Sequence, residues 1–158
     1  MPANGWNLYG RYRRAAGLTQ ERAAELLDCP VRTLANWEAG TYLPPDDRVV
    51  MMVDVYQSPT LAIEHLRSRS AMAARLLPEV VGKPLAQAVL SLLVAMDEFE
   101  VCESDVELMK IAADGKVSGE ETRRMLLLLG QLNGIVQAAY EVRLACDREM
   151  GVTGDGKD

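Results

Sequence analysis

The fold is decided by residues 18–40, which read LTQERAAELLDCPVRTLANWEAG. Thr19 stands where a helix N-cap belongs, and the apolar residues after it repeat at the spacing of one helix face. The Cys29-Pro30 pair forces an extended residue before a second helix, because proline disfavours helical geometry at the preceding position and suits a helix's first turn. Gly40 ends that second helix. The stretch therefore predicts two short helices joined by a tight turn.

Short helices are also expected on both sides of this stretch. Apolar residues from position 8 onward recur at helical spacing and stop before Gly17, a natural helix terminator. Two further helices are expected after Asp46-Asp47 and after Ser58-Pro59, the last ending near Ser68. Residues 1–68 therefore predict a five-helix unit, and its third helix has the placement that lets a helix lie in a DNA major groove.

The identities go further than the spacing. The segments LTQE at 18–21, AELL at 24–27 and RTLANWEAG at 32–40 resemble the Cro/repressor-type helix-turn-helix family, often called XRE-like. The resemblance covers roughly residues 5–58, about a third of the chain. It implies a sequence-specific regulator of transcription that binds double-stranded DNA, most simply a repressor, of bacterial or phage type.

The resemblance also implies which side chains meet DNA. Gln20, at the start of the second helix, matches a glutamine that donates to a DNA phosphate, and a helix N-terminus already favours an anion there. The exposed positions that face base edges or the adjacent backbone are Val31, Arg32, Thr33 and Asn36. Of these, Arg32 has the fork that pairs with guanine, and Asn36 has the amide that pairs with adenine.

A second set of matching residues is structural. Arg13 and Glu38 match a pair that forms a semi-buried salt bridge between the first helix and the end of the third. Breaking one partner of such a pair costs ~3–5 kcal/mol when it is well buried. The apolar residues expected in the core of the motif are Leu18, Ala24, Leu27, Leu34 and Trp37.

The sequence departs from the family pattern at four places. Asp28 stands at the turn position usually held by glycine, which is tolerable because aspartate visits positive φ at modest cost. Pro30 replaces the usual Ser or Thr N-cap, and Ala39 replaces a common polar residue. The loop 41–44 lacks the basic residues that many relatives carry. Pro30 removes a side-chain cap worth ~1 kcal/mol, and Ala39 removes one possible phosphate contact.

The net charge is unexpected for a nucleic-acid binder. The formal charge is −6, and residues 1–58 hold six basic against seven acidic residues, so most of the excess lies in the second half of the chain. Because basic residues supply most non-specific DNA affinity, we expect weak, dimer-dependent binding with a shallow salt dependence. Two alternatives stay open: an acidic protein-interaction module such as an antirepressor or adaptor, and an antitoxin or DNA-packaging subunit that uses the same motif.

The second half of the chain predicts a long antiparallel helical hairpin over residues 84–149, after a linker at 69–83 and before a flexible tail at 150–158. Its helices are expected at 84–113 and 119–149, so the whole fold is all-α. Extra apolar residues exceed what one hairpin can cover, which indicates a homodimer or higher homo-oligomer; an acidic run from Asp97 to Glu107 leaves room for a protein partner. The expected inner seams are Leu85, Val89, Leu92, Met96 and Phe99, and Leu128, Leu132, Ile135, Ala139, Val142 and Cys146.

No motif points to catalysis, a metal or a cofactor. The chain has one histidine, His65, without a recognisable nucleophile motif beside it, and three cysteines without CxxC spacing. The longest charge-free stretch, residues 125–140, is shorter and more polar than a membrane span requires, and the N-terminus lacks the pattern of a secretory signal. We therefore expect a cytoplasmic protein that is not an enzyme, needs no cofactor and has no membrane contact.

Overall fold

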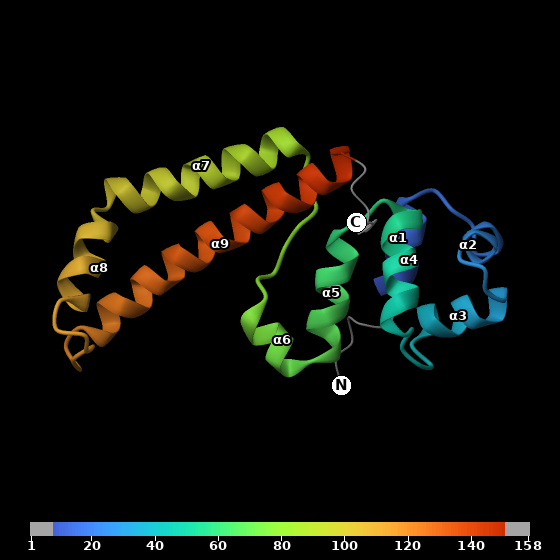
Figure 1. Cartoon of the computed structure of the whole chain (residues 1–158), viewed down its shortest axis with the longest axis horizontal. Coiled ribbons are helices and arrows are strands. Elements are labelled where there is room, and N and C mark those ends of the chain that lie inside the picture. Colours follow the sequence, from blue (N-terminus) through green and yellow to red (C-terminus); the bar gives the residue numbers. More distant parts are fainter. Residues whose placement is uncertain (1–7, 151–158) are drawn as a thin grey trace, which may run out of the picture. The chain divides into compact units, whose positions relative to one another are not determined.

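The computed structural model describes residues 8–150, and all regular secondary structure in that range is helical, which confirms the all-α fold (Figure 1). The chain divides into two compact units. The first comprises the described residues up to Gly82 together with Cys146–Met150, and the second comprises Lys83–Ala145. No helix among residues 8–150 is long and apolar enough to cross a membrane.

Four helices of the first unit end in the same way. At the end of the second helix, Asp28 has φ 46°, the Cys29 N–H donates to the Ala24 carbonyl at 3.0 Å, and the Asp28 N–H donates to the Glu25 carbonyl at 3.2 Å. This pair of bonds around a left-handed residue recurs at Gly17, Gly40 and Gln57, and it satisfies carbonyls that a helix end leaves free. The helices of this unit are α1 (Leu8–Ala15), α2 (Gln20–Leu26), α3 (Val31–Ala39), α4 (Asp46–Tyr56), α5 (Thr60–Arg69) and α6 (Ala71–Leu76).

A single apolar core holds α1 to α5 together. A buried polar line crosses it: the Tyr9 hydroxyl lies 2.8 Å from His65 Nδ1, and His65 Nε2 lies 3.1 Å from Asp46 Oδ1, so the line joins α1, α5 and the start of α4. Burial raises the pKa of Tyr9 to about 12, which keeps this hydroxyl protonated as a hydrogen-bonding group. The buried apolar residues are Leu8, Tyr9, Ala23, Ala24, Leu27, Leu34, Trp37, Val49, Met52, Tyr56 and Leu61.

The stretch expected to be a linker, residues 69–83, contains a helix, α6. The Ser70 hydroxyl caps it by accepting from the Ala73 N–H at 3.3 Å. Arg67 of α5 reaches across to donate to the carbonyls of Ala74 and Leu77. Arg67 lies seven residues before the first carbonyl that it binds, so this contact leaves no local signal in the sequence. The Ser70 cap is a local signal for α6 that the linker prediction did not include.

The second unit contains α7 (Leu85–Val101), α8 (Ser104–Ala112) and most of α9 (Thr122–Met150). The single helix expected over 84–113 is wrong, because the chain turns at Glu103, whose φ is 50°. No glycine or proline marks this break. The turn lets the Ser104 hydroxyl donate to Gln131 Oε1 of α9 at 2.7 Å, and α8 crosses the end of the hairpin (Figure 1).

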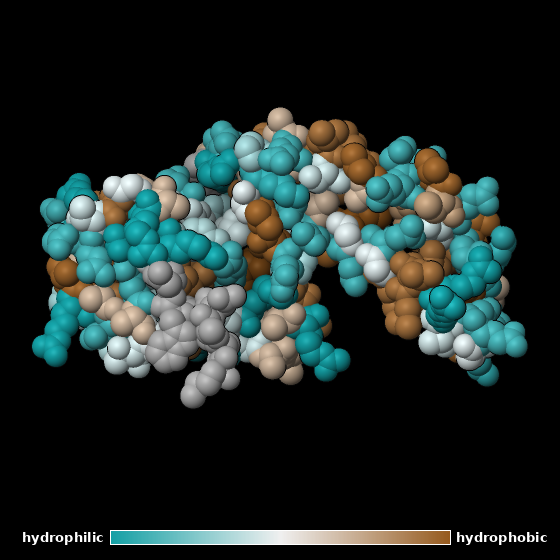
Figure 2. Space-filling view, turned by 180° about the vertical axis from the view of Figure 1, so that it is seen from behind, coloured by the Kyte–Doolittle hydropathy of each residue, from teal (hydrophilic) through white to brown (hydrophobic). Residues whose placement is uncertain are grey.

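The inner seam of the hairpin keeps most of its expected members but differs at Val89 and Met96 on α7 and at Ala139 on α9. Ala88 is fully buried, whereas Val89 and Met96 are 38% and 51% exposed. On α9, Ala138 is buried in place of Ala139. Ala88 and Ala138 thus share the inner seam with larger residues such as Leu92 and Leu128, while Val89 and Met96 face outward, contrary to the assignment that apolar bulk suggests. Hydrophobic surface is therefore exposed over this unit, on the right of Figure 2.

Replacing Glu103 with glycine should stabilise the chain. A side chain in the left-handed region costs ~1–2 kcal/mol, whereas glycine adopts this conformation without that strain but loses more entropy on folding. We expect Glu103→Gly to raise the free energy of unfolding by ~0.5–1 kcal/mol in urea denaturation. Glu103→Val should lower it, and equal stability of all three proteins would contradict a left-handed turn at this position.

Candidate nucleic-acid interface

The α2–turn–α3 segment is held at both ends by its own sequence. The Thr19 hydroxyl accepts from the Arg22 N–H at 3.2 Å at the start of α2. Pro30 begins α3 without any side-chain cap, and Gly40 closes α3 with φ 69°. Four residues, 27–30, join the helices, with Asp28 in the left-handed position usually given to glycine. The turn between the helices is therefore fixed by backbone geometry.

A buried ion pair joins α1 to the end of α3. Arg13 Nε donates to Glu38 Oε1 at 2.5 Å and Arg13 Nη2 donates to Glu38 Oε2 at 2.9 Å, with side chains only 9% and 7% exposed. Arg13 Nη1 also donates to the Leu18 carbonyl, between α1 and α2. The guanidinium on α1 thus binds both the α1–α2 loop and the end of α3. Its contact with Glu38 has the two-pronged geometry that makes Arg–carboxylate pairs strong.

Electrostatics keeps this pair charged. Burial alone would raise the pKa of Glu38, but the hydrogen bonds from Arg13 and Gln20, together with the positive charge of Arg13, lower that pKa below its usual value. The hydrogen bond to Glu38 raises the pKa of Arg13 despite its burial. The pair therefore stays ionised at neutral pH and can orient α3.

Gln20 lies beside this pair and is already engaged. Its Nε2 donates to Glu38 Oε2 at 2.9 Å. In the same first turn, hydrogen bonds from the Glu21 backbone N–H and the Thr19 hydroxyl lower the pKa of the Glu21 carboxyl. A phosphate at this helix start would meet an amide held by Glu38 and a negative carboxylate.

The outward face of α3 is open. Val31 is 40% exposed, Arg32 is exposed, and Thr33 and Asn36 are half-buried on the same helix. Arg32 forms no hydrogen bond or ion pair within residues 8–150. The opposite face is closed, because Leu34 and Trp37 are buried together with Ala24 and Leu27 of the α2 side, while Leu18 is half-buried. The proposed base-reading residues and the proposed core residues thus lie on different sides of α3.

Other arginines near this face are committed to internal contacts. Arg11 pairs with Glu64 of α5. Arg48 donates to the Leu27 carbonyl at 2.9 Å and so satisfies the end of α2. Arg14 is exposed, like Arg32, and no contact holds it within residues 8–150. Two arginines of the four on α1, α3 and α4 that could line a DNA face therefore remain available.

The segment after α3 presents two residues that the sequence analysis set aside. Tyr42 and Leu43 are 46% and 52% exposed directly beyond Gly40. A tyrosine hydroxyl can donate to a phosphate, so a lack of basic residues does not exclude a backbone contact here. The signal for it in the sequence is an aromatic residue, Tyr42, in a short loop between two helices.

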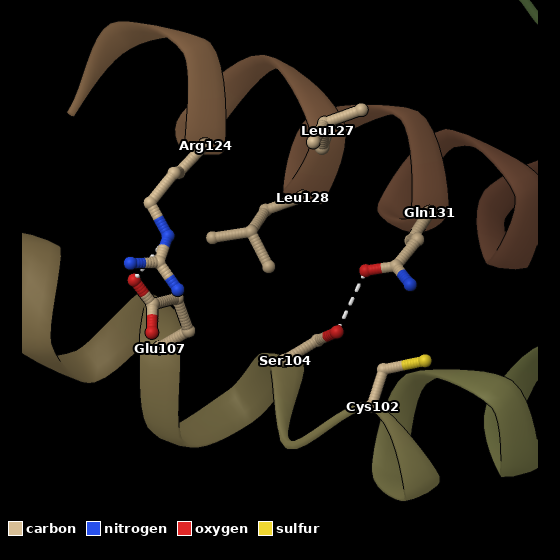
Figure 3. A pocket seen from close by; sticks show the side chains of 7 residues that line it. All are labelled: Cys102, Ser104, Glu107, Arg124, Leu127, Leu128 and Gln131. Atoms are coloured by element: carbon tan, nitrogen blue, oxygen red, sulfur yellow. Dashed lines mark hydrogen bonds and ion pairs between the residues drawn. The ribbon is translucent and has the colours of Figure 1, made fainter. Parts of the chain in front are cut away.

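The second unit contains an open pocket of about 340 Å³ between α8 and α9 (Figure 3). Arg124 Nε pairs with Glu107 Oε1 at 2.9 Å on one side, and the Ser104–Gln131 hydrogen bond lies on the other. Cys102 also lines this pocket. The ion pair and the hydrogen bond hold α8 against α9.

Breaking the Arg13–Glu38 pair should strongly destabilise the first unit. Arg13→Met leaves a buried carboxylate without its partner. We expect this variant to lower the free energy of unfolding by ~3–5 kcal/mol, measured by chemical denaturation. Arg22→Met removes an exposed pair with Glu25 and should cost ~1 kcal/mol or less. Similar losses for the two variants would contradict a central role for Arg13.

The same pair predicts an acid limb of stability. Because the folded pKa of Glu38 lies below the usual value of 4.5, its contribution is complete above that pH and is lost as the pH falls through the folded pKa. The midpoint temperature of thermal unfolding should therefore fall less steeply from pH 6 to pH 2 in Glu38→Gln than in the wild type. Glu25→Gln, at an exposed position, serves as the control and should follow the wild type.

The comparisons with known proteins bear on this unit. Residues 10–66 match the family model of a helix-turn-helix domain. No curated protein and no solved structure matches the chain. The matched range runs from α1 into α5 and includes the buried ion pair and the open face of α3. Residues 10–66 therefore form a helix-turn-helix domain, consistent with the resemblance of this part of the chain to the Cro/repressor type.

Proposed function

We propose that this protein is a sequence-specific DNA-binding regulator of transcription, a repressor that places α3 in the major groove and dimerises through the helices of the second unit. The open outward face of α3 is the observation that carries this proposal. Its inner face is locked by Leu34, Trp37 and the Arg13–Glu38 pair, so the orientation of Arg32 and Asn36 is set before DNA arrives. Such preorganisation reduces the entropy cost of binding.

Arg32 is the principal base reader in this proposal. It lies in the first turn of α3, where recognition helices contact base edges, and a two-pronged contact to guanine discriminates by ~1–3 kcal/mol. Asn36, one turn later, offers an amide to adenine or to a phosphate. Gln20 serves as a positioning contact, because its amide must share Glu38 with Arg13 while it approaches a phosphate.

Dimerisation compensates for the small number of phosphate contacts. With Arg11 and Arg48 held internally, a single copy has few free cations near α3. Two copies double those contacts and read two half-sites, ~34 Å apart for successive turns of one DNA face. The exposed apolar residues of the second unit supply surface for such pairing.

Selection of bound sequences from random duplex DNA tests the proposal. We expect a two-fold symmetric consensus, and Arg32→Ala should weaken binding by about ten- to a hundredfold while losing preference at one position of each half-site. Arg75→Ala is the matched control, since this exposed arginine ends α6 and should leave the consensus unchanged. No enrichment over random DNA at low salt would overturn the proposal.

One observation favours a second candidate, the acidic interaction module. The last turn of α7 carries Asp97, Glu98 and Glu100, all exposed, and Glu103 and Asp105 follow them. Capture of a basic protein without DNA binding would support this reading. A symmetric DNA consensus would eliminate this candidate. The antitoxin and DNA-packaging roles use the same α3 contacts with DNA, and what a copurifying protein partner does would separate them.

A further inference from the structure

Each long helix of the second unit carries two heptad seams, and the second of them is uncovered. The inner seam runs through Leu85, Ala88 and Leu92 on α7 and through Leu128, Ile135 and Ala138 on α9, all buried or half-buried. An outer seam lies one residue later on each helix, again at spacings of three and four. Its members are Ala86, Val89, Leu93, Met96 and Glu100 on α7, and Met125, Leu129, Leu132, Val136, Ala139 and Arg143 on α9.

The two outer seams lie on the same side of the hairpin. One residue advances a helix by about 100°, and two antiparallel helices turn in opposite senses when viewed from one end. The residue after each inward residue therefore points to the same side on both helices. On this side Leu93 is 57% exposed, Met96 is 51%, and Val136 is 46%. A groove of about 450 Å³ borders Leu93, Met96 and Glu100, so these three residues share one surface.

The middle parts of both outer seams lie between the same two contacts of the hairpin. The Lys83–Glu141 ion pair, 2.6 Å long, closes one end, and the Ser104–Gln131 hydrogen bond closes the other. Leu93 is about midway in sequence between Lys83 and Ser104. The midpoint between Gln131 and Glu141 falls at Val136, next to the centre of the α9 seam.

We propose that this face pairs with the same face of a second copy, with the two α7 helices antiparallel and a two-fold axis at Leu93. This deepens the dimerisation in the proposed function by naming the face and the register. The ends of the α7 seam, Ala86 and Glu100, lie seven residues on either side of Leu93, with Val89 four residues before it and Met96 three after it. A two-fold axis across the helices places Glu100 of one copy opposite Ala86 of the other.

Charge favours a second copy in this orientation. The last turn of α7 carries Asp97, Glu98 and Glu100, where the helix dipole favours cations. Its first turn has no acidic residue, and its N-cap, Pro84, provides no side-chain hydrogen bond. Antiparallel pairing brings each Glu100 to the uncapped, partly positive start of the partner's α7. Parallel pairing would instead bring the acidic turns together.

The composition of the face also suits a copy of itself. Among the described residues of the two outer seams, Glu100 and Arg143 are the charged members, and both lie at the ends. A helix that is apolar on nearly every side, as α7 is before Asp97, is typical of a buried helix. Four helices then enclose one core, the arrangement of a four-helix bundle.

Sedimentation equilibrium of the full chain without DNA tests the face. We expect a wild-type dimer, and Leu93→Glu should raise its dissociation constant at least about tenfold because two carboxylates meet on the axis. Met109→Glu is the control, since Met109 is 66% exposed but lies on α8, outside the α7 seam. A monomeric wild type, or a larger effect at Met109 than at Leu93, would overturn the proposal.

A compensation test fixes the register. Glu100→Lys and Ala86→Glu each improve the match of α7 to its own dipole, yet each should weaken the dimer about three- to thirtyfold, because a like charge then faces the partner twice per dimer. The double variant should restore wild-type association. Additive losses, or tighter association of either single variant, would overturn the antiparallel register.

The outcome is separable from that for DNA binding. A dimer with the predicted compensation but without a DNA consensus retains the pairing and removes the proposed regulator. A monomer that still loses sequence preference on Arg32→Ala retains DNA recognition and removes the pairing. Circular dichroism of each variant confirms that the helices are formed, so loss of association is assigned to the face.

Discussion

The first unit depends on one buried interaction, the pair between Arg13 and Glu38. It joins α1 to the last turn of α3, and its third guanidinium nitrogen binds the carbonyl of Leu18. Without it, the short helices would rely on apolar contacts that resist separation but do not fix rotation. A directional, charged contact in a region of low dielectric sets the rotation of α3 about its axis. Which residues face outward from α3 follows from that rotation.

The same pair explains why the charge of the motif does not measure its capacity to bind DNA. Glu38 is one of seven acidic residues in residues 1–58, but it is neutralised internally by Arg13. Arg11 pairs with Glu64 at the surface, and Arg48, which keeps its charge, is held by the carbonyl of Leu27. The relevant field is set by the exposed charges near α3, chiefly Arg32 and Arg14, and not by the total.

How much could be predicted depended on whether the cause was local. The ends of α2 and α3 follow from Thr19, Pro30 and Gly40, whose effects act within a few residues, and these ends were predicted well. The break at Glu103 was missed, because the gain from it lies in the contact of Ser104 with Gln131, 27 residues away. The contacts of Gln20 with Glu38 and of Arg48 with the Leu27 carbonyl were not predicted, because the partners are distant in sequence.

The hairpin of the second unit leaves large apolar side chains exposed on α7. Apolar bulk alone assigns Val89 and Met96 to the inside, yet Ala88 and Ala138 are buried while these two larger side chains are exposed. Apolar side chains of this unit therefore remain at the surface. Burial of apolar surface contributes ~25 cal/mol per Å² and is the main favourable term in folding. A second copy on the outer seam would therefore add stability that one hairpin lacks. Folding of the second unit and the pairing that we propose for its outer seam would then be linked in one concentration-dependent equilibrium.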